Sequence, residues 1–270
     1  MEHFDVLIVG AGLSGIGAGA HLRMECPNKS FAIFEGRAAM GGTWDLFKYP
    51  GIRSDSDMFT LGYRFRPWTD PKAIADGPAI LNYIKETSAE YDLDRAIRYN
   101  HRVRKAAWSS DNAQWLVEAE VGEDKRFTEF TCNFLYLCTG YYDYEKGYTP
   151  EWPGFNSFKG RIVHPQKWTD DIDYEGKKVV VIGSGATAVT LVPAMAEKAG
   201  HVTMLQRSPT YILSLPSSDR IANFFRAILP SRAAYFLTRW KNIFIGMFLY
   251  ALSRKRPSAM KKLIAKGVKK

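Results

Sequence analysis

Two glycine-rich fingerprints, GAGLSG at residues 10–15 and GSGATA at residues 183–188, constrain the fold of this chain more than any other feature. Each follows an apolar, strand-like run and precedes a segment of helical composition, which is the context of a dinucleotide-binding turn. One such string is weak evidence, because a structural turn can match it. Two copies in the same context predict an α/β protein with two Rossmann-like dinucleotide-binding units.

The glycines of the first fingerprint have separate expected tasks. Gly10 makes the tight turn, Gly12 lets the backbone approach a pyrophosphate, and Gly15 lets the following helix pack on the strand. The first unit's expected strand and helix are residues 4–9 and 13–25. The second unit's expected strand, helix and strand are residues 177–183, 187–198 and 201–207.

The end of the second strand in each unit discriminates between nucleotides. In the first unit it is Glu35, a carboxylate about 20 residues beyond the turn that can accept hydrogen bonds from a ribose. In the second unit it is Gln206, Arg207 and Ser208, a cation and a hydroxyl suited to a 2′-phosphate. We therefore expect FAD in the first unit and NADP(H) in the second.

Residues 40–57, MGGTWDLFKYPGIRSDSD, are too rich in Gly, Pro and aromatic residues for a regular element. The backbone at Gly41 and Gly42 can approach a ligand closely, and the Trp44 ring offers a flat apolar face. Asp55 is a carboxylate in a turn. A ligand-binding loop and a structural loop with a packed tryptophan both fit this composition.

Between the fingerprints we expect a helix from residue 79 to about residue 99, then antiparallel strands with turns at residues 110–112 and 122–124. The last strand ends in residues 134–138, which we expect to be buried and to return beside the first sheet. A loop-like segment follows and contains His164 beside a proline, where a histidine that completes a turn is the simpler interpretation than a catalyst.

The composition is that of a globular chain, with 270 residues that are 46% hydrophobic, enough for one or two domains. Cys26, Cys132 and Cys138 lack CxxC spacing, which argues against a zinc site and a redox disulfide, so we expect no metal. No basic segment followed by an apolar stretch begins the sequence, and the expected location is the cytoplasm.

The net charge of +9 comes from the C-terminal segment. Residues 220–270 hold 13 Lys and Arg and no acid, whereas the preceding residues have 24 basic against 28 acidic groups, a net charge of −4. Because apolar residues nearly encircle the middle helix expected here, we expect these helices to pack on the body of the protein. The alternative is peripheral contact with a membrane surface, since the longest uncharged run, residues 242–253, is too short to cross a bilayer. No nucleic-acid partner is expected, because basic charge alone gives only non-specific attraction.

Two further motifs make the sequence recognisable. Phe158, Gly160, His164 and Trp168 form FxGxxxHxxxW, and residues 41–55 form GGxWxxxxYPGxxxD. Together with the two fingerprints, these motifs resemble the type I Baeyer-Villiger monooxygenases, and YPGIRSDSDMFTLGYRFRPW resembles the branch that contains the ethionamide-activating monooxygenase. More distant alternatives are the flavin-containing and N-hydroxylating monooxygenases, which share the two-cofactor architecture.

The resemblance implies an FAD that is reduced by NADPH and reacts with dioxygen to a flavin peroxide, which oxygenates a small ketone to an ester or a sulfide to a sulfoxide. Beyond the glycines and Glu35, it implies FAD contacts at Ser14, Thr43, Trp44, Asp45, Leu46, Asp55 and Val103. It implies NADP contacts at Arg53, Ser54, Gly183, Ser184, Gly185, Ala186, Thr187, Ala188, Val189, Arg207 and Ser208. Asp55 would pair with a catalytic arginine, and Gly160, His164 and Trp168 would tune the hinge between domains.

Two departures accompany the resemblance. Thr169 stands where the fingerprint usually continues with Pro or Asp, and family members run to about twice this length. We therefore expect the N-terminal half of such an enzyme, without its catalytic arginine. The expected parts are an FAD-binding domain at residues 1–145, the first part of an NADP-binding domain at 146–210 and a basic helical segment at 211–270. Rival interpretations are a nucleotide-binding remnant, a membrane-surface module and a half that associates with a separate C-terminal half.

Overall fold

The computed structural model describes residues 1–208, 212 and 216–268. Its contacts divide the chain into two units. Unit 1 comprises Met1–Lys48 and Gly77–Thr169, and unit 2 comprises Tyr49–Asp76 and Asp170–Lys270. The predicted domain limits at residues 145 and 210 remain predictions.

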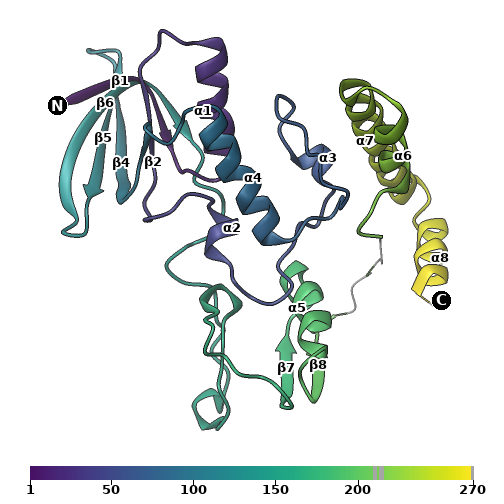
Figure 1. The fold of residues 1–270 in the computed structure, drawn as a ribbon. Coiled ribbons are helices and arrows are strands. Elements are labelled where there is room, and N and C mark those ends of the chain that lie inside the picture. Colours follow the sequence, from purple (N-terminus) through teal and green to yellow (C-terminus); the bar gives the residue numbers. More distant parts are fainter. Residues whose placement is uncertain (209–211, 213–215, 269–270) are drawn as a thin grey trace. The chain divides into compact units, whose positions relative to one another are not determined.

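Unit 1 is built on a six-stranded sheet in the order β3-β2-β1-β6-β5-β4 (Figure 1). The strands are β1 (Glu2–Val9), β2 (Phe31–Phe34), β3 (Ile97–Arg98), β4 (His101–Ser109), β5 (Gln114–Val121) and β6 (Arg126–Leu137). β1 pairs in parallel with β2 and β6, and β2 with β3, whereas β4, β5 and β6 form an antiparallel meander. The carboxyl ends of the parallel strands meet at one edge, which is where ligands bind in open α/β sheets.

Two long helices and several short ones complete unit 1. They are α1 (Leu13–Glu25), α2 (Thr43–Leu46), α4 (Gly77–Glu90), η1 (Phe155–Ser157) and η2 (Pro165–Lys167). α1 packs on the parallel strands, and α4 packs beside α1. Ile8, Ile16, Ile33 and Ile84 have no exposed surface, and burying an aliphatic side chain of this size contributes about 1.5–3 kcal/mol.

The expected helix at residues 79–99 is too long by about nine residues. α4 ends at Glu90, and Asp92 has a left-handed backbone with φ 48°. The N–H of Leu93 then bonds the carbonyl of Ser88 at 2.9 Å, which closes the helix. Residues 97 and 98 form β3 instead, because they pair with β2.

The expectation of a buried stretch at residues 134–138 is also wrong. β6 does return beside β1 in parallel, as predicted. Its Phe134, Tyr136 and Leu137 side chains are nevertheless 59%, 47% and 63% exposed. The described residues therefore leave this end of the sheet partly uncovered.

Unit 2 contains a β-α-β unit, a short helix and three C-terminal helices. They are β7 (Lys178–Ile182), α5 (Ala186–Ala196), β8 (His201–Leu205), α3 (Met58–Leu61), α6 (Arg220–Ile228), α7 (Ser231–Lys255) and α8 (Pro257–Val268). β7 and β8 pair in parallel, as the sequence predicts. Arg239 of α7 donates to the carbonyls of Phe59 and Thr60 at 2.9 and 3.1 Å, which fixes α3 against α7.

The expectation that the middle C-terminal helix is buried is wrong over much of its length. In α7 only Ala234 and Thr238 are buried, whereas Phe244, Met247 and Phe248 are 60%, 62% and 65% exposed. The apolar residues that encircle this helix in the sequence therefore lack a covering layer among the described residues. No helix in the described part of the chain is long and apolar enough to span a membrane.

Candidate functional site

The turn between β1 and α1 brings three glycines together for different physical reasons. Gly10 has φ +105°, and its N–H donates to the carbonyl of Phe34 at 2.7 Å. A Cβ at Gly15 would overlap the carbonyl oxygen of Gly10, so α1 can approach the turn this closely only with glycine there. Gly12 has φ −81°, and the nearest atom to a Cβ built on it is 3.6 Å away, at the Cα of Gly42. The fold itself does not demand glycine at residue 12, which leaves that backbone open to a ligand.

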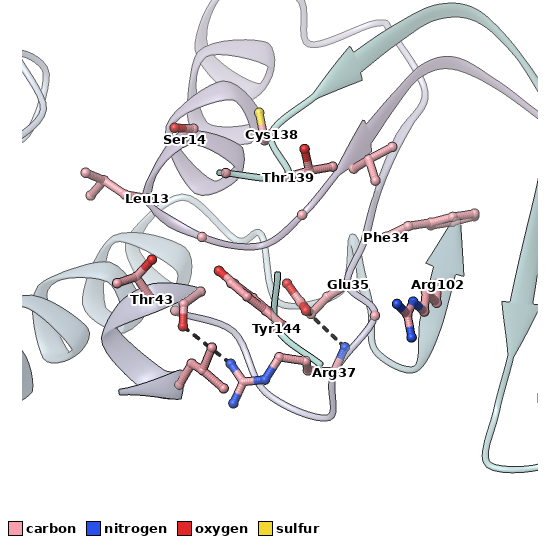
Figure 2. A pocket seen from close by; sticks show the side chains of 18 of the residues that line it. Leu13, Ser14, Phe34, Glu35, Arg37, Thr43, Arg102, Cys138, Thr139 and Tyr144 are labelled. Carbon is pink, nitrogen blue, oxygen red and sulfur yellow. Dashed lines mark hydrogen bonds between the residues drawn. The ribbon is translucent and has the colours of Figure 1, made fainter. Parts of the chain in front are cut away.

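Glu35 lies directly after β2 and is 5% exposed. One carboxylate oxygen accepts the N–H of Ala11 at 2.9 Å. The other accepts the N–H of Arg37 at 3.0 Å, and Figure 2 shows this bond. These bonds fix the carboxylate beside the glycine turn. A carboxylate has about four acceptor positions, so capacity remains for the hydroxyls of a ribose.

The first part of the loop at residues 40–57 docks on this turn. The N–H of Gly41 donates to the carbonyl of Ala11 at 2.9 Å, and a Cβ at Gly42 would lie 3.2 Å from the Cα of Gly12. The Arg37 guanidinium pairs with the Asp45 carboxylate at 2.6 Å across the loop. The glycine backbone at Gly12 thus faces the glycine backbone at Gly41 and Gly42. This contact lies at the N-terminus of α1, where backbone N–H groups lack intrahelical partners.

These elements surround a cavity of about 470 Å³ at the carboxyl edge of the sheet (Figure 2). Eight of the predicted FAD contacts line it: Gly10, Gly12, Ser14, Glu35, Thr43, Trp44, Leu46 and Val103. Gly15 serves the packing of α1, and Asp45 pairs with Arg37. Asp55 belongs to unit 2, and its expected contact with FAD stays a prediction.

Sequence reasoning missed several residues in the cavity wall, namely Arg37, His101, Arg102, Thr139, Tyr144 and Glu145. Arg102 pairs with Glu145, and the Arg37 guanidinium lies 5.9 Å from the centre of the Tyr144 ring. Burial raises the pKa of Tyr144, although its hydrogen bond with Thr43 opposes the shift. The available signal was YYDYEKGY, an aromatic and charged segment that follows β6 at the ligand-binding edge of the sheet.

The second part of the same loop lies with the second fingerprint in unit 2. A Cβ at Gly51, where φ is +78°, would come within 2.8 Å of the Ala194 side chain, so the loop packs directly on α5. Tyr49 is 7% exposed; burial raises its pKa, a hydrogen bond with Thr187 lowers it, and the Asp55 charge raises it again. The structure thus brings Tyr49 and Asp55 toward the start of α5, within the predicted NADP turn.

The other predicted NADP contacts differ in how they are held. Gly183 has φ +127°, and its N–H donates to the carbonyl of Leu205 at 2.8 Å, while Gly185 caps α5. Ser54 is buried, and its hydroxyl accepts the N–H of Ala75 at 3.1 Å, so part of its role is structural. Arg207 follows β8 and is exposed, as are Arg53 and Ser208 at the surface of unit 2.

The FxGxxxHxxxW segment forms a compact turn at the end of unit 1. His164 begins η2, and its Nδ1 accepts the N–H of Gln166 at 3.2 Å. A Cβ at Gly147 would overlap the imidazole, and a Cβ at Gly160 would come within 2.6 Å of the Phe158 ring. The chain leaves unit 1 one residue after Trp168. His164 therefore completes a turn beside a passage between units, which is compatible with the predicted hinge role.

Comparison with known proteins adds the family. A family model described as "Flavin-binding monooxygenase-like" matches residues 69–263. The chain belongs to this family. A second model, described as an NAD(P)-binding Rossmann-like domain, matches residues 8–72, and the resemblance drawn from the motifs is confirmed.

Individual relatives and solved structures match most of the chain. The "FAD-containing monooxygenase EthA" of Mycolicibacterium smegmatis is 57% identical over 97% of this chain. A steroid monooxygenase solved with NADP superposes with a TM-score of 0.72 at 32% identity over 86% of this chain. A mutant cyclohexanone monooxygenase from Rhodococcus sp. Phi1, solved with NADP+, gives a TM-score of 0.74 at 25% identity over 87% of this chain. The match includes 53%, 43% and 44% of these relatives, respectively, so the chain spans about half their length.

Proposed function

We propose that this chain is the nucleotide-binding part of an FAD- and NADPH-dependent monooxygenase that uses dioxygen to convert a small ketone to an ester, and that also oxygenates sulfides. The observation that carries the proposal is the cavity in unit 1, where a fixed carboxylate and a backbone without side chains face the N-terminus of a helix. Relatives named as FAD-containing, and neighbouring structures named for a steroid and for cyclohexanone, support the same reaction class.

The residues present fit FAD in the first cavity. The backbones of Gly12 and Gly42 would leave room for the pyrophosphate, which the helix N-terminus favours electrostatically. Glu35 would accept the ribose hydroxyls while its two backbone bonds hold it in place. Thr43 and Tyr144, whose side chains are hydrogen-bonded to each other, would form the wall of the cavity on the loop side.

The second fingerprint fits NADPH. The turn from Gly183 to Val189 would bind the pyrophosphate at the start of α5, and Arg207 with Ser208 would bind the 2′-phosphate. Burial raises the pKa of Tyr49, and its side chain is hydrogen-bonded to Thr187, a residue of this turn.

Bound FAD would supply the electron transfer and oxygen activation that amino-acid side chains cannot supply. The tasks of this chain are to bind and orient the two nucleotides. Asp55 is proposed to hold a catalytic arginine, as a carboxylate near Tyr49 in unit 2. A permanent cation held in this way would stabilise negative charge that develops on oxygen.

The test compares flavin binding by the purified 270-residue chain with that of Gly12→Val and Gly246→Val. The control, Gly246, has no atom within 4 Å of an added Cβ, so the same change there is harmless to a ligand in unit 1. Wild type and control should bind FAD, and Gly12→Val should bind it at least tenfold more weakly. Retention of full FAD affinity by Gly12→Val would contradict the assignment.

Because this chain is expected to lack the catalytic arginine, the reaction class is tested separately on the chain joined to the C-terminal half of EthA. NADPH and cyclohexanone are supplied, and ester formation is followed by gas chromatography. Ester formed in step with NADPH consumption supports the proposal. Flavin binding without any oxygenated product would instead identify a nucleotide-binding protein without this activity.

A further inference from the structure

The exposed side of α7 carries an aromatic stripe. Phe236, Trp240, Phe244 and Phe248 recur every four residues and are 58%, 43%, 60% and 65% exposed. Neighbouring ring centres are 6.1 Å apart for Phe236 and Trp240 and 5.5 Å apart for Trp240 and Phe244. We call these four residues the aromatic stripe. Contiguous exposed apolar surface of this kind marks an interaction site.

The opposite side of α7 is fixed to the rest of unit 2 by polar contacts. Arg239 donates to carbonyls of α3, and Asn242 donates to the Asp57 carboxylate at 2.9 Å. Lys241 pairs with Asp219 at the start of α6, and Thr238 is buried. Since residues 238, 241 and 242 face the unit, the helix geometry turns Phe236 and Trp240 outward. Phe244 and Phe248 are exposed because they lie farther along α7, beyond these contacts.

Exposed basic residues are numerous on α7 and on the helices before and after it. Seven exposed basic residues of the described helices α6, α7 and α8 and their junctions are Arg220, Arg232, Arg254, Lys255, Arg256, Lys261 and Lys262. The sequence from residue 220 to residue 270 contains no Asp or Glu to oppose them. α6 adds exposed Ile221, Phe224 and Ile228. A partner that binds this surface must therefore offer both an apolar region and negative charge.

We propose that the aromatic stripe of α7 docks on the surface of an anionic lipid membrane, with the helix lying in the plane of the headgroups. Ile245, Met247, Leu249 and Tyr250 are also exposed, so apolar surface encircles the second half of α7. Exposed aromatic and aliphatic residues with flanking Lys and Arg are typical of helices that lie in the interface. The uncharged run at residues 242–253 extends about 18 Å as a helix, which is short of the roughly 30 Å needed to span the hydrocarbon core. A second copy is disfavoured because two equally basic surfaces repel each other.

The test is vesicle flotation with the full 270-residue chain. Vesicles of phosphatidylcholine are compared with vesicles that also contain phosphatidylglycerol. We expect the protein to float with the anionic vesicles and at least tenfold less with the neutral ones, and to be released by salt, which screens the charges. Amide hydrogen exchange in residues 236–250 should slow when anionic vesicles are added.

The double variant Phe244→Glu, Phe248→Glu should float at least tenfold less. Phe127→Glu is the matched control, because Phe127 is 67% exposed on β6 in unit 1 and should leave flotation unchanged. The hydrogen-exchange measurement uses wild type and so does not depend on the folding of the variants. Three results would each overturn the proposal: no flotation with anionic vesicles, equal flotation of the double variant, or protection of α7 only on self-association or on binding a C-terminal polypeptide.

Discussion

Replacing Glu35 by Gln tests how one carboxylate serves both the fold and the ligand. The side chain is 5% exposed and accepts two backbone N–H groups, from Ala11 and Arg37, at 2.9 and 3.0 Å. Gln has nearly the same shape but only one acceptor oxygen, and its amide NH₂ would face one of the two N–H donors. One of the two bonds must therefore be lost.

The expected effects follow from the charge and burial of these bonds. A hydrogen bond to a charged group contributes about 1.5–3 kcal/mol, and a buried donor left without a partner costs about 1–3 kcal/mol. The protein without nucleotide should therefore be destabilised by about 1–3 kcal/mol. FAD should bind about tenfold to a hundredfold more weakly, because the ribose loses a charged acceptor and the remaining acceptor is less well oriented.

Two measurements separate these effects. Urea unfolding of the nucleotide-free protein reports the fold, and titration with FAD followed by flavin fluorescence reports the site. Glu118→Gln is the control, because Glu118 pairs with Lys105 at 3.0 Å on the surface of β5, where such a pair contributes about 0–1 kcal/mol. If Glu35→Gln changed neither the unfolding midpoint nor the FAD affinity, the reasoning about this carboxylate would be refuted.

Three further predictions concern other parts of the chain. Arg207→Ala should weaken NADPH binding by about 1.5–3 kcal/mol and leave NADH almost unchanged, and equal weakening in parallel titrations would contradict the 2′-phosphate assignment. Burial alone would raise the pKa of Asp219, but the hydrogen bonds from Lys241 and from backbone N–H groups of α6 lower it below its ordinary value. Because the pKa of Asp219 is lower in the folded state than in the unfolded state, its charge stabilises the fold at pH values above the pKa of the unfolded state. This stabilisation is lost as the pH falls through the pKa of the folded state. In acid unfolding followed by circular dichroism, the stability of Asp219→Asn should therefore depend less on pH than that of the wild type. An unchanged pH profile would count against a stabilising role of the Asp219 charge. Burial raises the pKa of Cys132 to about 11, so a thiol reagent should label exposed Cys26 quickly and Cys132 only on unfolding, as mass spectrometry of the peptides would reveal.

The local parts of the fold could be predicted because their signals are local. An apolar run followed by Gly10 or Gly183 predicts the strand and turn, and the next strand follows after one helix in each unit. Ile97 and Arg98 form β3 only because they pair with β2, and this long-range pairing leaves no periodic signal in two residues. Propensity alone therefore extended α4 too far.

Like the pairing of β3, the burial of α7 and the set of residues that line the cavity depend on tertiary packing. The apolar sequence around Phe244 resembles that of a core helix, but only contacts with other elements decide burial, and the described residues do not cover it. In the cavity, the glycines and Glu35 belong to a spaced motif and were predicted to lie together. Arg102 and Tyr144 enter the wall from separate segments, and no fixed spacing connects them to that motif.

The three passages of the chain between the units have a consequence for synthesis on the ribosome. Residues 49–76 belong with residues 170–270, but the chain must complete most of unit 1 between them. At about 5–20 residues per second, roughly 90 intervening residues take about 5–20 s to emerge. During that interval Met58 and Phe59, which are buried in the finished protein, have no completed partner surface. The nascent chain therefore displays an apolar segment to chaperones or to neighbouring chains before its own helices arrive, and slower translation would prolong this exposure.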